Sequence, residues 1–362
     1  MSNIKKGYLM VNGYQIGGSV DTILSETSEN PVENKVVYTA LNQKLNTATY
    51  NNDKQTIDNS LLELATRASR KTAAERNSFV VIKDITNDVY NTSSTLWTKL
   101  KNGDFSEVNV GNYIIGKKTG TKYWLVDCDY YYGNRTSGYG VAGYAENTHH
   151  LAIMPELLKG VSTLLWSGKE YAGATNNNTS QGCAPWAVKD DAGVNDTTGA
   201  YSSSYIRTTV LKAVYDNWLK ADFEDYGISV LSFYELNANQ TNATATSASC
   251  SLLTGASSNW TWENQNTAKC TLPSIQNLIG GDGWQSSAYD CGVLKEMLSI
   301  FKAGMSYQYF TGEGNWRQKC TWTKSVASAA RVCRVDANDG NSGYGNASSA
   351  FGVRPLAFIA VA

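Results

Sequence analysis

Hydrophobic residues near the N-terminus fall into two short runs. GYLMVNGYQIGG, residues 7–18, has one run on each side of Asn12-Gly13, a dipeptide that favours a two-residue hairpin turn. A hairpin of this size buries very little apolar surface by itself. We therefore expect residues 1–32 to form a hairpin and a polar extension that dock on another protein or on copies of the same chain.

The apolar positions then change to a helical spacing. They recur at intervals of four and three, first at Val37, Leu41 and Leu45, and then at Ile57, Leu61, Leu64 and Ala68. A narrow apolar stripe with polar flanks is typical of a coiled-coil seam. The spacing predicts a coiled-coil stem over residues 33–78 with a break or a poorly packed stretch at 47–55. One amphipathic helix packed on a globular domain is the alternative, and so few heptads do not fix the number of chains.

From residue 79 the pattern is that of a globular domain. Strands are predicted at residues 79–85, 149–155, 228–236 and 351–362, with a hairpin between residues 112 and 132. Helices are predicted at residues 88–105, from Tyr205 to about residue 223, and at residues 294–304. Long loops rich in Asn, Ser, Thr and Gly separate these elements, as at residues 172–204 and 237–272. The fold class predicted for residues 79–362 is therefore mixed α+β.

Composition favours recognition of polar ligands over binding of nucleic acid. The chain has 31 Lys and Arg against 32 Asp and Glu, and no long basic run marks a nucleic-acid or anionic membrane partner. Its 22 Tyr and 10 Trp supply rigid contact area, while abundant Ser, Gly and Asn supply adaptable hydrogen bonds. No secretory signal or membrane span is recognised, so no membrane insertion is expected.

Seven cysteines are scattered along the chain, and none forms a CxxC motif or lies at zinc-like spacing from a histidine. This favours free, mostly buried thiols formed in a reducing cytoplasm, although a disulfide between some pair stays open. The residues concerned are Cys128, Cys183, Cys250, Cys270, Cys291, Cys320 and Cys333.

Residues that could carry catalysis are few. His149 and His150 are adjacent, and neighbours on a strand point to opposite faces, so the two rings are not expected to share a metal. A glycan-cleaving site needs two carboxylates across a cleft, and Asp127, Asp129 and Glu235 are candidates that the sequence does not pair. No hydrolase, zinc-protease, P-loop or dinucleotide motif is present. We therefore expect no enzyme and no cofactor.

One segment partly matches a calcium-binding loop. In DANDGNSG, Asp336 and Asn338 take the first and third positions of such a loop. The sixth position, which needs Gly, is Asn341, and the twelfth, which needs Glu, is Ala347. A solvated turn is therefore expected, without a metal.

The C-terminal stretch is the main candidate for binding. A long run of small and polar residues lies between Trp322 and the apolar strand that begins with Gly352-Val353-Arg354-Pro355. We expect Trp322 and this strand to form a fixed framework, Val332 and Val335 to hold the stretch down, and Arg354 to pair with an internal carboxylate. The predicted ligand-binding residues are Trp316, Trp322, Ser325, Ala327, Ala329, Arg331, Arg334, Asp336, Asn338, Asn341, Tyr344 and Asn346.

Several of these segments together resemble phage tail proteins. SENPVENKVVYTALNQKL, residues 28–45, resembles the segment that precedes globular heads in tail and baseplate proteins. GNYIIG, KYWLVDCDYYY, HHLAIMP, YSSSYIRTTVLKAVYDNW and the terminal WTKSVASAARVCRVDANDGNSGYGNASSAFGVRPLAFI resemble the heads of gut-phage tail proteins. The resemblance covers most of residues 80–362 together with the stem.

The resemblance implies a C-type-lectin-like head, related to formylglycine-generating enzymes, on a phage tail fibre or tail tip. It implies attachment to the virion through residues 1–32, host attachment by binding a protein or glycan receptor at the cell surface, and a homotrimer made in the host cytoplasm. It also implies that a diversity-generating retroelement rewrites the terminal stretch. A structural baseplate component and a polysaccharide-degrading tail spike are the alternatives.

Overall fold

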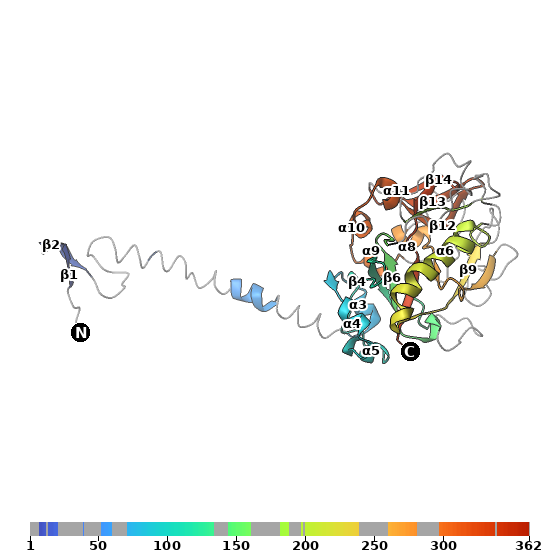
Figure 1. Cartoon of the computed structure of the whole chain (residues 1–362). Helices are drawn as coiled ribbons and strands as arrows, with labels where there is room; N and C mark the ends of the chain where they lie inside the picture. Colours follow the sequence, from blue (N-terminus) through green and yellow to red (C-terminus); the bar gives the residue numbers. More distant parts are fainter. Residues whose placement is uncertain are drawn as a thin grey trace. The chain divides into compact units, whose positions relative to one another are not determined.

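The computed structural model (Figure 1) describes residues 7–11, 14–20, 39, 52–59, 71–133, 144–160, 182–187, 197, 200–238, 260–280, 297–336 and 339–361. The chain divides into two compact units, residues 1–69 and residues 70–362. Within the described residues, no helix has both the length and the apolar character needed to cross a membrane.

The first unit contains the predicted hairpin. Strand β1 (Gly7–Val11) pairs antiparallel with β2 (Tyr14–Val20), and Val11 lies opposite Tyr14, so two residues connect the strands as the Asn12-Gly13 signal predicted. Residues 52–59 are helical, and Lys54 forms an ion pair with Asp58 one turn later at 3.1 Å. Of the two alternatives for residues 47–55, a break is therefore wrong for residues 52–55, which are helical but exposed. Most of the predicted seam lies outside the described residues.

The second unit begins before the position expected for the head. Helix α3 (Ala73–Arg76) starts at a capping box in which the Thr72 hydroxyl accepts from the backbone amide of Glu75. Arg76 is buried and donates from Nη1 to Oδ1 of Asn109 at 2.9 Å. Residues 70–78, which the apolar spacing assigned to the stem, thus belong to the second unit.

A seven-stranded sheet forms the centre of this unit. Its order is β11-β16-β6-β5-β4-β3, and β8 also pairs with β16. The strands are β3 (Lys83–Asp84), β4 (Asn112–Ile115), β5 (Lys122–Cys128), β6 (Leu151–Pro155), β8 (Ser229–Val230), β11 (Cys270–Thr271) and β16 (Leu356–Ala360). The predicted hairpin is confirmed as β4–β5, and the strand predicted at 149–155 is confirmed as β6. The strand predicted at 79–85 is reduced to the two residues of β3.

Helices cover both faces of this sheet. Successive side chains along its strands enter two different apolar cores. On β16, Ala357 and Ile359 belong to one core, and Phe358 belongs to the other. The first core includes α4 (Thr86–Tyr90), α5 (Thr95–Leu100) and a helix over residues 206–222. The second includes α8 (Ile275–Ile279), α9 (Ser299–Lys302) and α10 (Tyr307–Thr311). Both faces of β16 are therefore apolar, as expected of a strand that is covered on both sides.

The helix predicted from Tyr205 is confirmed and runs to Asp222 through η3 (Ile206–Val210), α6 (Leu211–Val214), η4 (Tyr215–Leu219) and α7 (Lys220–Asp222). Its five predicted apolar residues are all buried: Ile206, Val210, Leu211, Val214 and Trp218. The helix predicted at 88–105 is instead two helices, α4 and α5, and the helix predicted at 294–304 is limited to α9 among the described residues. Five cysteines, Cys128, Cys183, Cys270, Cys320 and Cys333, are free and buried.

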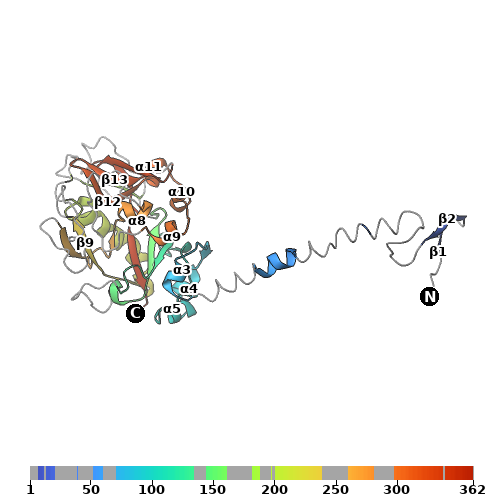
Figure 2. The same cartoon turned by 180° about the vertical axis from the view of Figure 1, so that it is seen from behind.

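The C-terminal stretch forms most of a second sheet, in the order β14-β13-β12-β15-β7. Its strands are β7 (Cys183–Pro185), β12 (Thr321–Ser328), β13 (Arg331–Val335), β14 (Ser342–Asn346) and β15 (Ala350–Gly352). Figures 1 and 2 place β12, β13 and α11 (Trp316–Lys319) at the end of this unit away from α5. The single strand predicted at 351–362 is therefore wrong.

That stretch is two strands, β15 and β16, which lie in different sheets. Pro355 lies between them and has no backbone N–H to give to a ladder, which favours an interruption at this point. The strand predicted at 228–236 is likewise divided into β8 and β9 (Tyr234–Ala238), and β9 pairs with β10 (Trp260–Asn264).

Candidate functional site

The two ends of the C-terminal stretch are held side by side by the second sheet. Trp322 is fully buried, its indole Nε1 donates to the carbonyl oxygen of Ala184 at 2.8 Å, and its ring meets Phe351 edge-on at 4.8 Å. Thr321 pairs with Gly352 in a parallel bridge. Trp322 is therefore part of the framework, as expected. Because none of its surface is exposed, its inclusion among the ligand-binding residues is wrong.

Along β14, buried glycines alternate with larger, exposed residues. Val332 pairs with Gly345, and a Cβ atom added to Gly345 would lie only 2.5 Å from Cε2 of Phe351. Cys333 pairs with Tyr344 and Arg331 pairs with Asn346, so these side chains share the other face. Glycine at position 345 lets β14 pack closely on the Trp322–Phe351 framework while Tyr344 and Asn346 remain exposed.

Three exposed residues form what we call the hairpin patch, namely Arg331, Tyr344 and Asn346. The guanidinium carbon of Arg331 lies 4.5 Å from the centre of the Tyr344 ring, and 39% of Tyr344 is exposed. The patch lies on β13 and on β14, and β14 is the edge strand of the sheet. Val332 and Val335 are buried on opposite faces of β13, in the first and the second core respectively, as expected of residues that hold the stretch down.

A second group, the tryptophan patch, consists of Trp316, Arg334 and Asp336. Trp316 is 49% exposed and lies 5.6 Å from Phe351, centre to centre. The guanidinium carbon of Arg334 lies 4.5 Å from the Phe351 ring and 5.8 Å from the Trp316 ring, and Arg334 forms an ion pair with Asp336 at 3.0 Å. The Phe351 ring thus contacts both Trp316 and Arg334. Arg334 lies on the face of β13 opposite Tyr344.

Other predicted binding residues differ in exposure. Ala329 and Asn341 are exposed and Ala327 is half-buried, whereas Asn338 lies outside the described residues. Ser325 is fully buried, and its hydroxyl accepts from the backbone N–H of Ile275 at 3.1 Å. Its predicted ligand contact is wrong, because β12 is covered by α8 at this position.

The calcium-like segment forms a closed turn around Asp336. The backbone amide of Asp336 donates to the carbonyl of Asn341 at 2.8 Å, and Gly340 donates to the carbonyl of Asp336 at 3.2 Å. The carboxylate of Asp336 is engaged by Arg334, and that of Asp339 accepts from the amide of Asn341. The Asp339 carboxylate thus has a partner within the turn, whereas the partners of the Asp336 carboxylate are Arg334 on β13 and the thiol of Cys320. No group of three potential ligands from Asp, Glu, His and Cys occurs among the described residues.

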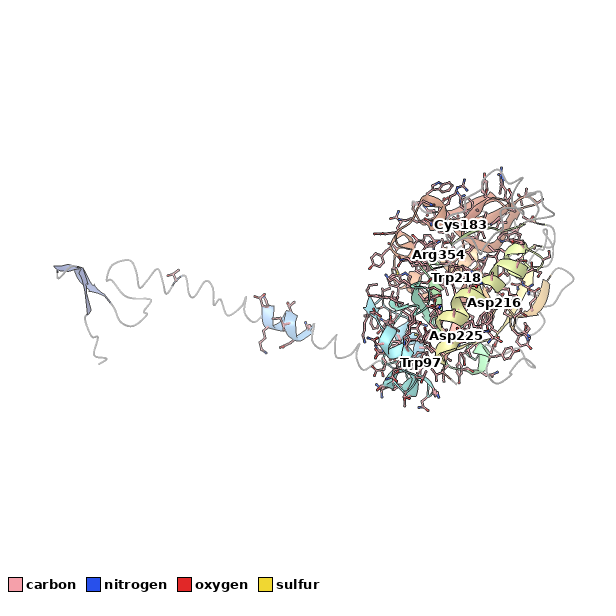
Figure 3. All side chains as sticks on the ribbon, in the orientation of Figure 1. Trp97, Cys183, Asp216, Trp218, Asp225 and Arg354 are labelled. Carbon is pink, nitrogen blue, oxygen red and sulfur yellow. The ribbon has the colours of Figure 1, made fainter. Side chains whose placement is uncertain are left out.

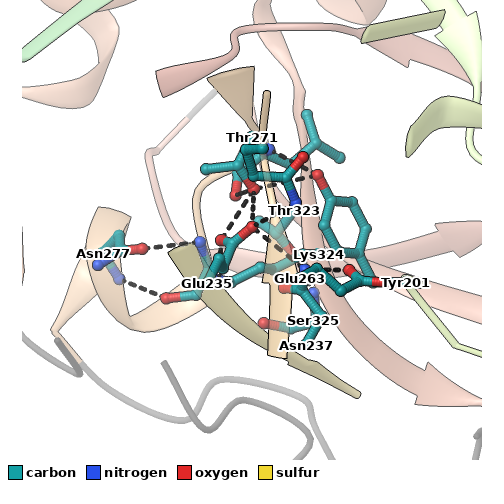
Figure 4. Close-up of polar contacts among 12 residues, drawn as sticks. Tyr201, Glu235, Asn237, Glu263, Thr271, Asn277, Thr323, Lys324 and Ser325 are labelled. Carbon is teal, nitrogen blue, oxygen red and sulfur yellow. Dashed lines mark hydrogen bonds and ion pairs between the residues drawn. The ribbon is translucent and has the colours of Figure 1, made fainter. Parts of the chain in front are cut away.

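A buried network of polar side chains connects β12 to neighbouring strands (Figure 4). Lys324 Nζ lies 2.6 Å from Oε1 of Glu235, and their side chains are only 8% and 1% exposed. Thr271 donates to the same carboxylate, and Tyr201 Oη lies 3.1 Å from the Thr271 hydroxyl. The network ties β12 to β9 and β11. Lys324 was not among the predicted site residues, although a lysine in the otherwise uncharged run Thr321–Ser328 was a signal for a buried partner.

The network continues to the β9–β10 hairpin. Asn237 donates from Nδ2 to Glu235 and also to Glu263, and Glu263 forms an ion pair with Arg207 at 3.0 Å. Burial raises the pKa of Glu263, and the charge of Arg207 opposes that shift. Glu235 and Glu263 are thus joined through one amide, and Glu235 has almost no contact with solvent.

The two histidines share one carboxylate, because Asp129 Oδ1 accepts from the backbone N–H of His150 at 2.9 Å and Asp129 Oδ2 lies beside His149. His149 Nδ1 lies 2.6 Å from Oδ2 of Asp129, and the His149 ring stacks on Tyr132 at 3.8 Å. His150 is fully buried, and its Nδ1 lies 2.8 Å from the carbonyl oxygen of Thr148. Burial lowers the pKa of His150. The two rings therefore serve different packing sites.

Asp127 is also buried, and it accepts from Asn77 Nδ2 at 2.7 Å and from the amide of Ser299 at 3.1 Å. Burial raises the pKa of Asp127 to about 6, and the two hydrogen bonds limit the shift. Asp127, Asp129 and Glu235 are thus engaged by different sets of partners, and none of these sets contains a second member of the trio.

Arg354 does not make the carboxylate pair that was expected. Its Nε donates to the backbone carbonyl of Glu156 at 2.6 Å, and its Nη1 donates to the Thr321 hydroxyl at 2.8 Å. Figure 3 shows Arg354 within the second unit, where it is 1% exposed. Burial lowers the pKa of Arg354. The residue joins both sheets through neutral oxygens and supports the framework at the start of β12.

Comparisons with known proteins give this chain no relative. No protein-family model matches it, and neither the curated proteins nor the solved structures contain a match.

Proposed function

We propose that this protein is the receptor-binding protein of a phage tail tip. In this proposal, residues 1–32 attach to the tail, a trimeric coiled coil forms the stem, and a C-type-lectin-like head contacts a host-surface receptor. The contact is made by the hairpin patch of Arg331, Tyr344 and Asn346, with the tryptophan patch as a second contact area. The support for the family is the sequence resemblance, and the support for the contact surface is its geometry.

The observation that carries the proposal is the alternation of buried and exposed residues along β14. A Cβ atom on Gly345 would collide with Phe351 of the framework and one on Gly343 with Asp336, whereas Tyr344 and Asn346 are exposed. Substitution of an exposed strand residue with no core contact changes stability very little. The outward positions are therefore free to differ between variants of the protein without loss of the fold, which suits a surface that follows a changing receptor.

The chemical character of the two patches also fits recognition. Arg, Tyr and Trp are the residues that most often dominate binding energy at protein interfaces. Here Arg331 and Tyr344 are prearranged by their own contact, and Arg334 is held by Asp336 and Phe351. Prearranged side chains lose less conformational entropy on binding. If three heads act together, modest affinity at each one produces strong attachment through high effective concentration.

The decisive experiment compares adsorption with assembly. Particles or purified full-length protein carrying Arg331→Ala with Tyr344→Ala are expected to lose most of their binding to host cells, while particle yield and the melting temperature stay at the wild-type level. Tyr226→Ala is the matched control, because Tyr226 is similarly exposed at 38% but lies in η5 (Glu224–Tyr226), outside both patches.

Normal adsorption with defective assembly would instead identify a structural tail component. Release of reducing sugar from host capsule by the wild-type protein, if abolished by the double variant, would replace the receptor-binding proposal with a polysaccharide-degrading one.

A further inference from the structure

A second candidate site lies outside the C-terminal stretch. An open cleft of about 680 Å³ is formed by β5, the residues after β6, α10 and the following loop. Its volume is within the range of small-molecule sites, about 300–1,000 Å³. The lining includes Lys122, Trp124, Glu156, Tyr309 and Glu313.

An exposed aromatic ring forms one wall of the cleft. Tyr309 is 54% exposed, and its ring centre lies 5.8 Å from that of Trp124, which is fully buried and donates from Nε1 to the carbonyl of Phe310 at 3.0 Å. The buried tryptophan thus fixes the position of α10. A large aromatic side chain left half in water on a fixed helix provides apolar contact area at low entropic cost.

The loop after α10 approaches the polar side of the cleft very closely. Gly312 has a φ of +62°, and a Cβ atom there would lie 1.8 Å from Oε1 of Glu156. Only glycine fits both the backbone conformation and this approach. Glu156 is held by Lys122, whose Nζ lies 3.2 Å from Oε2. The carboxylate is therefore fixed at the edge of the cleft.

The charges of the cleft argue against an ionic ligand. Lys122 Nζ already lies 3.8 Å from the Trp124 ring centre and 4.5 Å from that of Tyr113, so the protein's own ammonium group occupies the position a ligand cation would take. The charged lining residues are Lys122, Lys159, Glu156 and Glu313, two of each sign. A neutral ligand is favoured, and these groups supply both donors and acceptors.

From this combination we infer that the cleft binds a neutral saccharide. The apolar face of a sugar ring would pack on Tyr309, and its hydroxyl groups would pair with the Glu156 carboxylate and the Lys122 ammonium at the edge. Sugar rings have this dual character, since their C–H groups form an apolar face and their hydroxyl groups project around it. The inference does not depend on the hairpin patch and holds or fails separately from the proposed receptor contact.

The test uses the full-length protein and saturation-transfer NMR with the methyl glycosides of glucose, galactose, mannose, fucose, N-acetylglucosamine and N-acetylgalactosamine. Transfer to at least one of these sugars is expected, and Tyr309→Ala is expected to weaken its binding about tenfold. Tyr309→Trp keeps an aromatic ring and is expected to retain binding. Tyr344→Ala removes an exposed tyrosine from the hairpin patch and is expected to leave sugar binding within twofold of the wild-type value.

Three results would overturn the inference. The first is no transfer to any of the six sugars, and the second is binding that Tyr309→Ala leaves unchanged. The third is binding of trimethyllysine or arginine methyl ester, but of no sugar, that is lost in Tyr309→Ala. Because Tyr309 is largely exposed, an unchanged melting temperature is expected for all three variants and excludes misfolding as the cause. Loss of host adsorption in Tyr344→Ala with intact sugar binding would support the receptor proposal alone.

Discussion

Arg331 lies over the ring of Tyr344 on the outer face of the β13–β14 hairpin, with 4.5 Å between the guanidinium carbon and the ring centre. Exposed cation–π contacts contribute about 0.5–1 kcal/mol. We expect Arg331→Ala and Tyr344→Ala each to lower the free energy of unfolding by less than about 1 kcal/mol, with a coupling of about 0.5 kcal/mol in a double-mutant cycle. Urea unfolding measures these values, and a loss of about 3 kcal/mol or more from either change would contradict a display role.

Gly345 should behave in the opposite way from its neighbour Asn346. A methyl group at position 345 would lie 2.5 Å from Phe351 and 3.0 Å from Trp322, whereas Asn346 is exposed. Overpacking of this kind costs about 1–3 kcal/mol. Gly345→Ala is thus expected to lower the melting temperature clearly, and Asn346→Ala to leave it nearly unchanged. Equal effects of the two changes would mean that β14 does not separate framework from display.

Local patterns predicted the elements whose cause is local. The Asn12-Gly13 signal gave the N-terminal hairpin, and the apolar stripe from Ile206 to Trp218 gave the long helix. In the C-terminal stretch, Tyr344 and Asn346 were predicted to face outward because a run of small and polar residues has little that a core requires. These features need only neighbours in the chain or a fixed periodicity.

Features made by distant segments were not predictable in this way. Ser325 looked suitable for display, but α8 covers it with the amide of Ile275. Arg354 was expected to find a carboxylate, and it instead meets a carbonyl of Glu156 that only the paired sheets bring near. The cleft beside Tyr309 likewise forms only because Tyr309 lies close to Trp124, which is distant in the sequence. The hydrophobic periodicity of a segment does not indicate which distant segments it contacts.

The buried pair of Lys324 and Glu235 should contribute more to stability than any exposed ion pair among the described residues of the second unit. Removing one partner of a buried pair leaves an uncompensated charge and costs about 3–5 kcal/mol. Lys324→Met is expected to lower the free energy of unfolding by about that amount, and adding Glu235→Gln should recover part of the loss. Lys212→Met is the matched control, because Lys212 pairs with Asp216 on the surface and its loss should cost less than about 1 kcal/mol.

Chemical denaturation of Lys324→Met, of its combination with Glu235→Gln, and of Lys212→Met measures these free energies of unfolding. If Lys324→Met costs no more than Lys212→Met, the polar network does not hold β12 in place, and the support it lends to the hairpin is lost.

Asp127 should make the stability of the second unit depend on pH. Its pKa is raised by burial to about 6 from 3.8, so between these values the folded chain binds a proton more tightly than the unfolded chain. The stabilisation is complete below about pH 4 and is lost as the pH rises through 6, by about 3 kcal/mol in total. Asp127→Asn removes this dependence. The variant's free energy of unfolding, measured relative to wild type, should therefore increase from pH 4 to pH 7 and then stay constant.

The comparison between variant and wild type is needed because His150 acts in the opposite direction. Burial lowers the pKa of His150, so its protonation in the unfolded chain makes the protein less stable as the pH falls below about 6.5. This contribution is common to the wild type and to Asp127→Asn, and it cancels in their difference. Guanidinium unfolding at half-unit pH steps would show the effect. A difference that is flat from pH 4 to pH 7 would mean that Asp127 titrates in the folded protein at its ordinary pKa, and that the hydrogen bonds from Asn77 and Ser299 fully offset its burial.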